Sequence, residues 1–169
     1  MRKHLIALLA ITLFSCTVQP ELFTLTSSSD PEEGGEVSPK IGQYEAGQKV
    51  LIKATPNSEY ALGSWEGASG SSDTTSVVIN SDLEVVAKFI KKIYNLTINV
   101  EGQGSVSQKI IKEGSSTDYK SGTIVELIAI PADNWEFTQW KGDVSSTINP
   151  KEIEINSKKT ISAIFKIKN

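Results

Sequence analysis

Few side chains of this protein could carry nucleophilic catalysis or bind zinc. The 169-residue chain contains one cysteine, Cys16, and one histidine, His4, and both lie close to the N-terminus. Ser-His-Asp and Cys-His arrangements need an imidazole beside the nucleophile, and zinc sites are built mainly from Cys and His. The sequence therefore argues against an enzyme of these kinds, and it contains no motif that indicates a cofactor.

Paired carboxylates are a second route to catalysis. Glu152 and Glu154 are two positions apart, so on a β-strand both side chains would project from one face. A glycosidase needs two carboxylates about 5–9.5 Å apart across a cleft, which neighbours on one solvated face do not provide. We interpret this pair as a solvated strand face, and a hydrolase is kept only as an alternative.

Acidic side chains in loops could instead bind Ca²⁺ through oxygen atoms. Glu32 and Glu33 precede a Gly-Gly pair, and Asp73 and Asp82 lie in polar stretches. None of these residues has the spacing of an EF-hand or a similar calcium-binding loop. The sequence therefore predicts no metal site.

The three tryptophans are the best candidates for contact with a ligand, because aromatic faces can stack on sugar rings. Trp65 and Trp140 hold the same position in the two repeats described below, and Trp135 stands where the first repeat has Tyr60. A position filled by Trp in both copies is more simply a core aromatic. We therefore expect core positions, with a ligand platform of Trp65, Trp135 and Trp140 as the alternative.

The first residues have the plan of an export signal. Arg2 and Lys3 precede an apolar run over residues 5–14, which is of signal-peptide length and too short to span a bilayer comfortably. Residues 1–15 carry these two basic side chains and no acids. The sequence predicts an exported protein.

The end of this segment resembles a bacterial lipobox. Residues 13–16 read Leu-Phe-Ser-Cys, with Leu three positions before the cysteine and a small residue just before it, although Phe14 departs from the usual small or branched residue. The resemblance implies that Cys16 is lipidated, that residues 1–15 are removed and that the new N-terminal amine is acylated. An ordinary secretory signal with an incidental cysteine is the alternative.

A lipidated Cys16 would make the membrane a partner of this protein. Several acyl chains hold stably where one chain holds only marginally, since each buried CH₂ contributes about 0.8 kcal/mol. Thr17 follows the cysteine, where Asp would favour inner-membrane retention by the enterobacterial rule. We therefore predict the outer membrane, on its periplasmic or its exposed side.

Charge argues against nucleic acid as a partner. The whole chain has 17 basic and 20 acidic residues and a net charge of −3. Removing residues 1–15 takes away Arg2 and Lys3, which leaves 17 − 2 = 15 basic residues against 20 acidic ones, a net charge of −5. The sequence shows no basic stripe, which nucleic-acid binding would require.

The rest of the chain consists of two divergent copies of one unit, which we place at residues 22–90 and 91–169 after a short tether at residues 16–21. Eight positions of the first copy recur 75 positions later, and seven of the eight residue types are identical. Beyond these positions the offset becomes 76, which indicates one inserted residue. The eight pairs are Tyr44/Tyr119, Gly47/Gly122, Val50/Val125, Ala54/Ala129, Pro56/Pro131, Tyr60/Trp135, Trp65/Trp140 and Gly67/Gly142.

Each unit has the pattern of β-strands. Val50, Ile52 and Ala54 alternate with less apolar residues, and the same period of two recurs in residues 125–129. Glycine, proline and asparagine clusters separate these runs, as expected for turns. No stretch shows helical periodicity with capping residues, so the sequence predicts a mainly β fold.

These residues together resemble the divergent InlB B-repeat, a bacterial repeat domain. The shared order is Gly-x-Val, Tyr-x-x-Gly-x-x-Val, Ala-x-Pro, an aromatic residue, Trp-x-Gly and a closing apolar-x-Ala-x-Phe. The resemblance covers nearly all of the chain after Cys16. It implies two tandem small β units, β-grasp-like or small β-sandwiches, packed end to end or joined by a short linker at residues 90–93.

The resemblance identifies a module and implies no catalytic residues. We therefore expect a non-catalytic protein of the cell envelope whose repeats serve as a spacer or as an adhesion or protein-interaction module. The alternative is a non-catalytic carbohydrate-binding module that uses exposed tryptophans. The expected partners are the membrane and an envelope protein or glycan.

Overall fold

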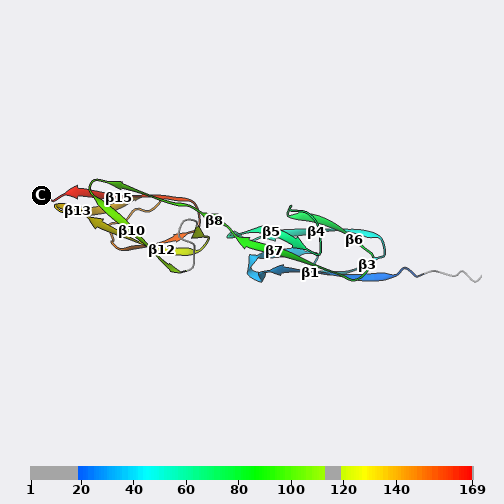
Figure 1. Ribbon diagram of the computed structural model, residues 1–169. Helices are drawn as coiled ribbons and strands as arrows, with labels where there is room; N and C mark the ends of the chain where they lie inside the picture. The colour runs from blue at the N-terminus through cyan, green and yellow to red at the C-terminus, as the bar shows by residue number, and fades with distance from the viewer. Residues whose placement is uncertain (1–18, 113–118, 169) are drawn as a thin grey trace, which may run out of the picture.

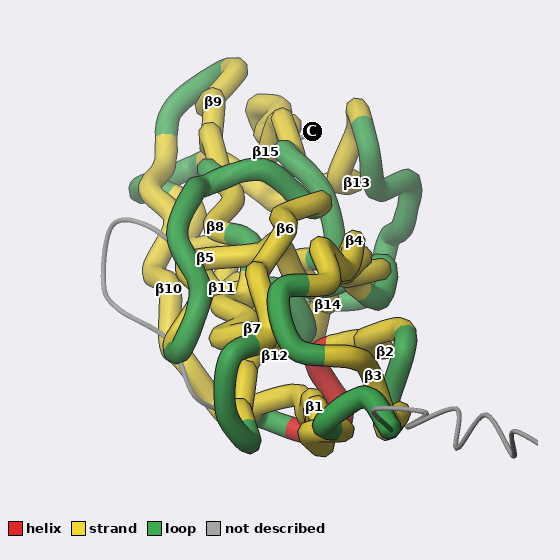
Figure 2. The backbone as a smooth tube through the Cα atoms, turned by 90° about the vertical axis from the view of Figure 1, so that its right-hand side faces the viewer, coloured by secondary structure: helices red, strands yellow, loops and turns green. Residues whose placement is uncertain are grey.

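The computed structural model describes residues 19–112 and 119–168, and within these residues the chain is mainly β (Figure 1). Its only helical segment there is the three-residue 3₁₀ turn η1, Glu32–Gly34. Figure 2 shows strands and connecting loops making up nearly the whole trace. The prediction of a mainly β protein built from two tandem units is confirmed, while Cys16 lies outside the described residues.

The first unit is built from two sheets, in strand orders β3-β1-β7-β5 and β2-β4-β6. β1 and β7 are its first and last strands, and they pair in parallel, while all other pairs are antiparallel. The chain therefore closes the first sheet by bringing its two ends together. The strands are β1 (Leu22–Asp30), β2 (Gly35–Ser38), β3 (Ile41–Glu45), β4 (Gln48–Pro56), β5 (Tyr60–Glu66), β6 (Thr74–Ile79) and β7 (Leu83–Lys91).

The second unit repeats this arrangement with its first sheet divided. Its sheets have strand orders β13-β15-β9, β10-β12-β14 and β11-β8. The small β8-β11 pair corresponds to the start of β1 and to β3, since Tyr94 lies opposite Tyr119 as Phe23 lies opposite Tyr44. The strands are β8 (Ile93–Tyr94), β9 (Leu96–Glu101), β10 (Gly104–Lys112), β11 (Tyr119–Lys120), β12 (Thr123–Pro131), β13 (Trp135–Gly142), β14 (Lys151–Ile155) and β15 (Lys159–Ile167).

The strand register agrees with the residue pairs found in the sequence. Trp65 lies opposite Ala87 in the first unit, and their counterparts Trp140 and Ala163 lie opposite each other in the second. The same bulge interrupts β5 between Leu62 and Ser64 and β13 between residues 137 and 139. The two copies therefore share their backbone pairing as well as their motif.

Each unit has a hydrophobic core of its own. Residues of the first core all lie between Leu25 and Phe89, and those of the second between Tyr119 and Phe165. Along β4, alternate side chains are buried and exposed, as the period of two predicts. Separate cores mean that neither unit borrows its main packing from the other.

A single residue joins the two units. β7 ends at Lys91 and β8 begins at Ile93, so Lys92 alone lies between them. The N–H of Lys92 donates to the carbonyl of Glu59 at 2.8 Å, and the N–H of Ser121 donates to the carbonyl of Lys92 at 2.8 Å. The connection is thus hydrogen-bonded to both units.

Candidate functional site

The two tryptophans shared by both copies are core residues. Trp65 is 8% exposed and Trp140 is fully buried. The indole N–H of Trp65 donates to the carbonyl of Ser72 at 2.9 Å, and that of Trp140 donates to the carbonyl of Ile148 at 3.0 Å. Core positions were expected. The ligand-platform alternative does not hold at these two positions, because no open indole face is left to stack on a sugar.

The glycine of each Trp-x-Gly motif is required by the backbone rather than by a ligand. Gly67 and Gly142 have φ of +77° and +99°, a region that favours glycine. A Cβ added at Gly67 would lie 2.1 Å from the carbonyl oxygen of Glu84, and one at Gly142 would lie 2.3 Å from that of Thr160. The motif is therefore explained by packing and backbone geometry in both copies.

Trp135 differs from the other two tryptophans. It is partly buried and packs against the edge of the second core, at the start of β13. Its ring also covers Gly102, where an added Cβ would lie 2.7 Å from the ring. Of the three predicted platform residues, only Trp135 keeps part of its surface open to a ligand.

The predicted carboxylate pair lies where the sequence placed it. Glu152 and Glu154 are both exposed, and they alternate along β14 with the buried Ile153 and Ile155. They therefore share one solvated face of a strand. Across the described residues, no group of three or more acidic, His or Cys side chains could hold a metal ion.

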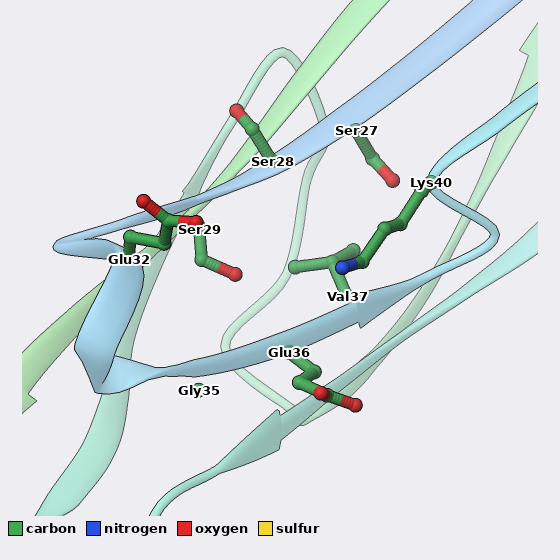
Figure 3. A pocket seen from close by; sticks show the side chains of 8 residues that line it. All are labelled: Ser27, Ser28, Ser29, Glu32, Gly35, Glu36, Val37 and Lys40. Atoms are coloured by element: carbon green, nitrogen blue, oxygen red, sulfur yellow. The ribbon is translucent and has the colours of Figure 1, made fainter.

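A pocket of about 410 Å³ lies in the first unit between β1 and β2. Figure 3 shows Ser29 and Lys40 directed into the space between these strands. The hydroxyl of Ser27 donates to the carbonyl of Pro39 and so supports the loop after β2. Glu32 and Glu36 border the pocket, and both are exposed.

This pocket does not contain the parts of a hydrolytic site. Ser27 has a backbone carbonyl as its partner rather than a base. The two glutamates that border the pocket are open to water, whereas a catalytic acid needs surroundings that hold its proton. Sequence patterns did not reveal the pocket, because it forms where two sheet edges diverge and carries no motif of its own.

A surface ion-pair cluster lies at the end of β1, where Asp30 meets side chains of β5 and β7. The ammonium of Lys88 lies 2.8 Å from the Asp30 carboxylate and 3.0 Å from that of Glu66. These hydrogen bonds, to Asp30 first and Glu66 second, raise the pKa of Lys88. All three side chains are solvent-exposed, so the cluster joins β1, β5 and β7 without forming an enclosed site.

Comparison with protein families decides what these units are. A model of the divergent InlB B-repeat domain matches the chain twice, over residues 25–93 and over residues 94–169. This chain belongs to the divergent InlB B-repeat family. Among curated proteins and among solved structures, none matches it.

The two B-repeats meet at the joint that the structure shows. The first match ends one residue after Lys92, and the second begins within β8. Within residues 19–112 and 119–168, no helix is long and apolar enough to cross a membrane.

Proposed function

We propose that this protein is a non-catalytic lipoprotein of the cell envelope, anchored in the outer membrane through Cys16, whose two B-repeats act as a protein-interaction module. The observation that carries the proposal is the make-up of the described chain. Two B-repeats account for it, and their shared tryptophans and glycines serve the cores and the backbone. Because the two copies share their core and turn residues, the outward side chains are the ones that differ between the copies. These side chains are therefore available for contacts with a partner.

The proposed anchor places the first repeat near the membrane. β1 begins at Leu22, and the carbonyl of Glu21 already accepts a hydrogen bond from Ala46. Six residues from Cys16 to Leu22 span at most about 20 Å at ~3.5 Å per residue. The first repeat would therefore stand close to the lipid surface, and the second would be freer to meet a partner.

The anchor is tested by metabolic labelling with palmitate and by membrane fractionation. The wild type should carry label and sediment with outer membranes, and Cys16→Ala should lose the label and leave the membrane fraction. Equal labelling of the two proteins would refute the anchor.

The choice between an interaction module and a simple spacer is tested by cross-linking in intact cells. An interaction module should give cross-linked products that depend on outward residues of the repeats, whereas a spacer should give none. A glycan array tests the carbohydrate alternative, which now depends on Trp135. Binding that is lost in Trp135→Ala would favour that alternative.

A further inference from the structure

The outward face of one sheet in the second repeat is unusually apolar. Along β12, the side chains of Ile124, Ile128 and Ile130 alternate with the buried core positions; Ile124 and Ile128 are half-buried, and Ile130 is 48% exposed. The first repeat has Lys49, Lys53 and Thr55 at the three corresponding positions, on the same backbone pairing. Since the fold is satisfied by polar residues at these positions, folding does not explain the three isoleucines, and a contiguous row of partly exposed apolar side chains is a candidate contact site.

Charged side chains flank this row of isoleucines on opposite sides. On the β14 side, Glu152 lies opposite Glu126 and Glu154 lies opposite Ile124. On the β10 side, Lys109 lies opposite Glu126 and Lys112 lies opposite Ile124. Among the described residues, none of these five charged side chains is in an ion pair with a distance of 4.0 Å or less. The face is therefore acidic along β14, apolar along β12 except at Glu126, and basic along β10 at Lys109 and Lys112.

Such a face is complementary to itself. If two copies pack face to face about a two-fold axis that runs along β12, β10 of each copy lies over β14 of the other. Lys109 and Lys112 of one copy then approach Glu152 and Glu154 of its partner, and the isoleucine rows meet at the centre. A two-fold axis across the strands would place lysine over lysine instead. Aligned packing of two sheets is a common arrangement, and a self-complementary patch is what a two-fold dimer requires.

We propose that the outward face of β10, β12 and β14 is the dimerisation surface of this protein, and that its partner is the same face of a second copy. The inference rests on the proposed function, of which it specifies the partner. Rotation about an axis along β12 keeps both N-termini at the same height along that axis. This orientation suits two chains anchored side by side in one membrane.

The size of the face predicts a weak dimer. A contact made by one face of three strands falls at the low end of the range for specific protein interfaces. The side chain of Glu126 would also lie close to the axis and face its own copy, with Lys109 beside it on β10. Anchoring both copies in one membrane raises their effective concentration, so the dimer should form more readily in the envelope than in dilute solution.

Sedimentation equilibrium of the full-length protein in detergent is the first test. The wild type should show a reversible monomer–dimer equilibrium. Ile128→Lys, which introduces the residue type that the first repeat has at this position, should raise the dissociation constant about tenfold or more. Leu51→Lys makes the matched change on β4 of the first repeat, where Leu51 is 67% exposed, and should leave the equilibrium unchanged. A wild type that stays monomeric at every concentration, or equal effects of the two variants, would overturn the proposal.

Charge reversal provides a second test that does not depend on the isoleucines. Lys109→Glu and Glu152→Lys should each weaken the dimer, and the double variant should recover much of the lost affinity because the paired charges are restored across the axis. Each variant is also measured by thermal unfolding, so that a loss of folding is not taken for a loss of association. Failure of the double variant to recover would contradict the proposed pairing.

Cysteine cross-linking in the native envelope separates this inference from the proposed function. Ile128→Cys should be cross-linked to a second copy by a short thiol-reactive bismaleimide, since residue 128 of one copy would face residue 128 of the other about 10 Å away, too far for a direct disulfide, and Leu51→Cys should not. Wild-type protein with an acylated Cys16 should form no such dimer, and palmitate labelling reports the anchor independently. Labelled protein that does not cross-link through residue 128 would refute the dimer and leave the lipoprotein proposal intact.

Discussion

The indole N–H of Trp140 donates a hydrogen bond of 3.0 Å to the backbone carbonyl of Ile148. The acceptor lies eight positions after the donor, against seven positions from Trp65 to Ser72 in the first repeat, where the same bond measures 2.9 Å. The residue inserted in the second copy is thus absorbed by the loop while the hydrogen bond is kept. The tryptophan of the motif fixes this loop against the core in both repeats.

Replacement of Trp140 by Phe should destabilise the second repeat. The change removes the donor for the Ile148 carbonyl and leaves space where the larger ring was fully buried. We expect a loss of about 2–3 kcal/mol in the free energy of unfolding, measured by urea denaturation. Trp135→Phe removes a ring that is only partly buried and should cost about 1 kcal/mol or less. Equal losses in the two variants would contradict the core role given to Trp140.

Two glycines of similar backbone conformation make a second comparison. Gly142 has φ +99° and its added Cβ would lie 2.3 Å from the Thr160 carbonyl oxygen, while Gly47 has φ +82° and nothing within 4 Å of an added Cβ. Gly47→Ala should therefore cost only about 1–2 kcal/mol of backbone strain. Gly142→Ala should cost more than about 3 kcal/mol, because backbone must also move. Thermal or urea unfolding of both variants checks the order, and a reversed order would show that the contact with Thr160 is not limiting.

The burial of Tyr119 should make the free energy of unfolding depend on pH in the alkaline range. Its side chain is buried, its hydroxyl donates to the side-chain oxygen of Gln108 at 2.9 Å, and burial raises its pKa from the ordinary value of 10.0. The unfolded chain therefore releases this proton at a lower pH than the folded protein does. The stability that Tyr119 contributes is complete below about pH 10 and is lost as the pH rises through the folded-state pKa.

Urea denaturation at several pH values checks this dependence. Tyr119→Phe has no proton to release at this position, so between about pH 9 and pH 11 it should lose less stability than the wild type. Tyr44→Phe makes the same change at the corresponding position of the first repeat, where the side chain is only half-buried, and should follow the wild type more closely. Identical slopes for the wild type and Tyr119→Phe would exclude Tyr119 as the source.

Much of the fold could be predicted because the same pattern of residues occurs twice in the chain. Identical residues at an offset of 75 fix which positions are equivalent, and alternation along residues 50–54 fixes which side chains face the core. The structure confirms both, since Val50 and Val125 are buried and lie opposite Val77 and Ile153, which are equivalent at the offset of 76. Side-chain period and core packing are local properties that a sequence displays directly.

The pairing of distant strands could not be predicted in the same way. The parallel pairing of β1 with β7 brings Leu25 opposite Leu83, and no local pattern in either strand specifies that neighbour. The dimerisation face was also missed, although its residues were visible. Ile124, Ile128 and Ile130 are apolar residues next to other apolar residues, so only the burial of the alternate positions shows that they point away from the core.

The joint between the repeats supports a final prediction. Lys92 donates through its N–H to the Glu59 carbonyl, and Lys168 makes the equivalent bond to Asn134 at 2.9 Å at the end of the second repeat. Proline at either position removes the donor. Lys92→Pro should loosen the joint while both cores remain folded, because each core is built from the residues of its own repeat. Lys168→Pro removes the same bond where no further described strand follows, so it should affect only the local end of β15.

Limited proteolysis with a protease of broad specificity distinguishes these two variants. Lys92→Pro should be cleaved faster near residues 91–93 and yield two stable fragments of about the size of single repeats, since cleavage follows the local opening of the backbone. Lys168→Pro should keep the wild-type rate of cleavage at the joint. If Lys92→Pro is instead degraded to small peptides, the two repeats depend on each other for folding, and the independence of their cores is wrong.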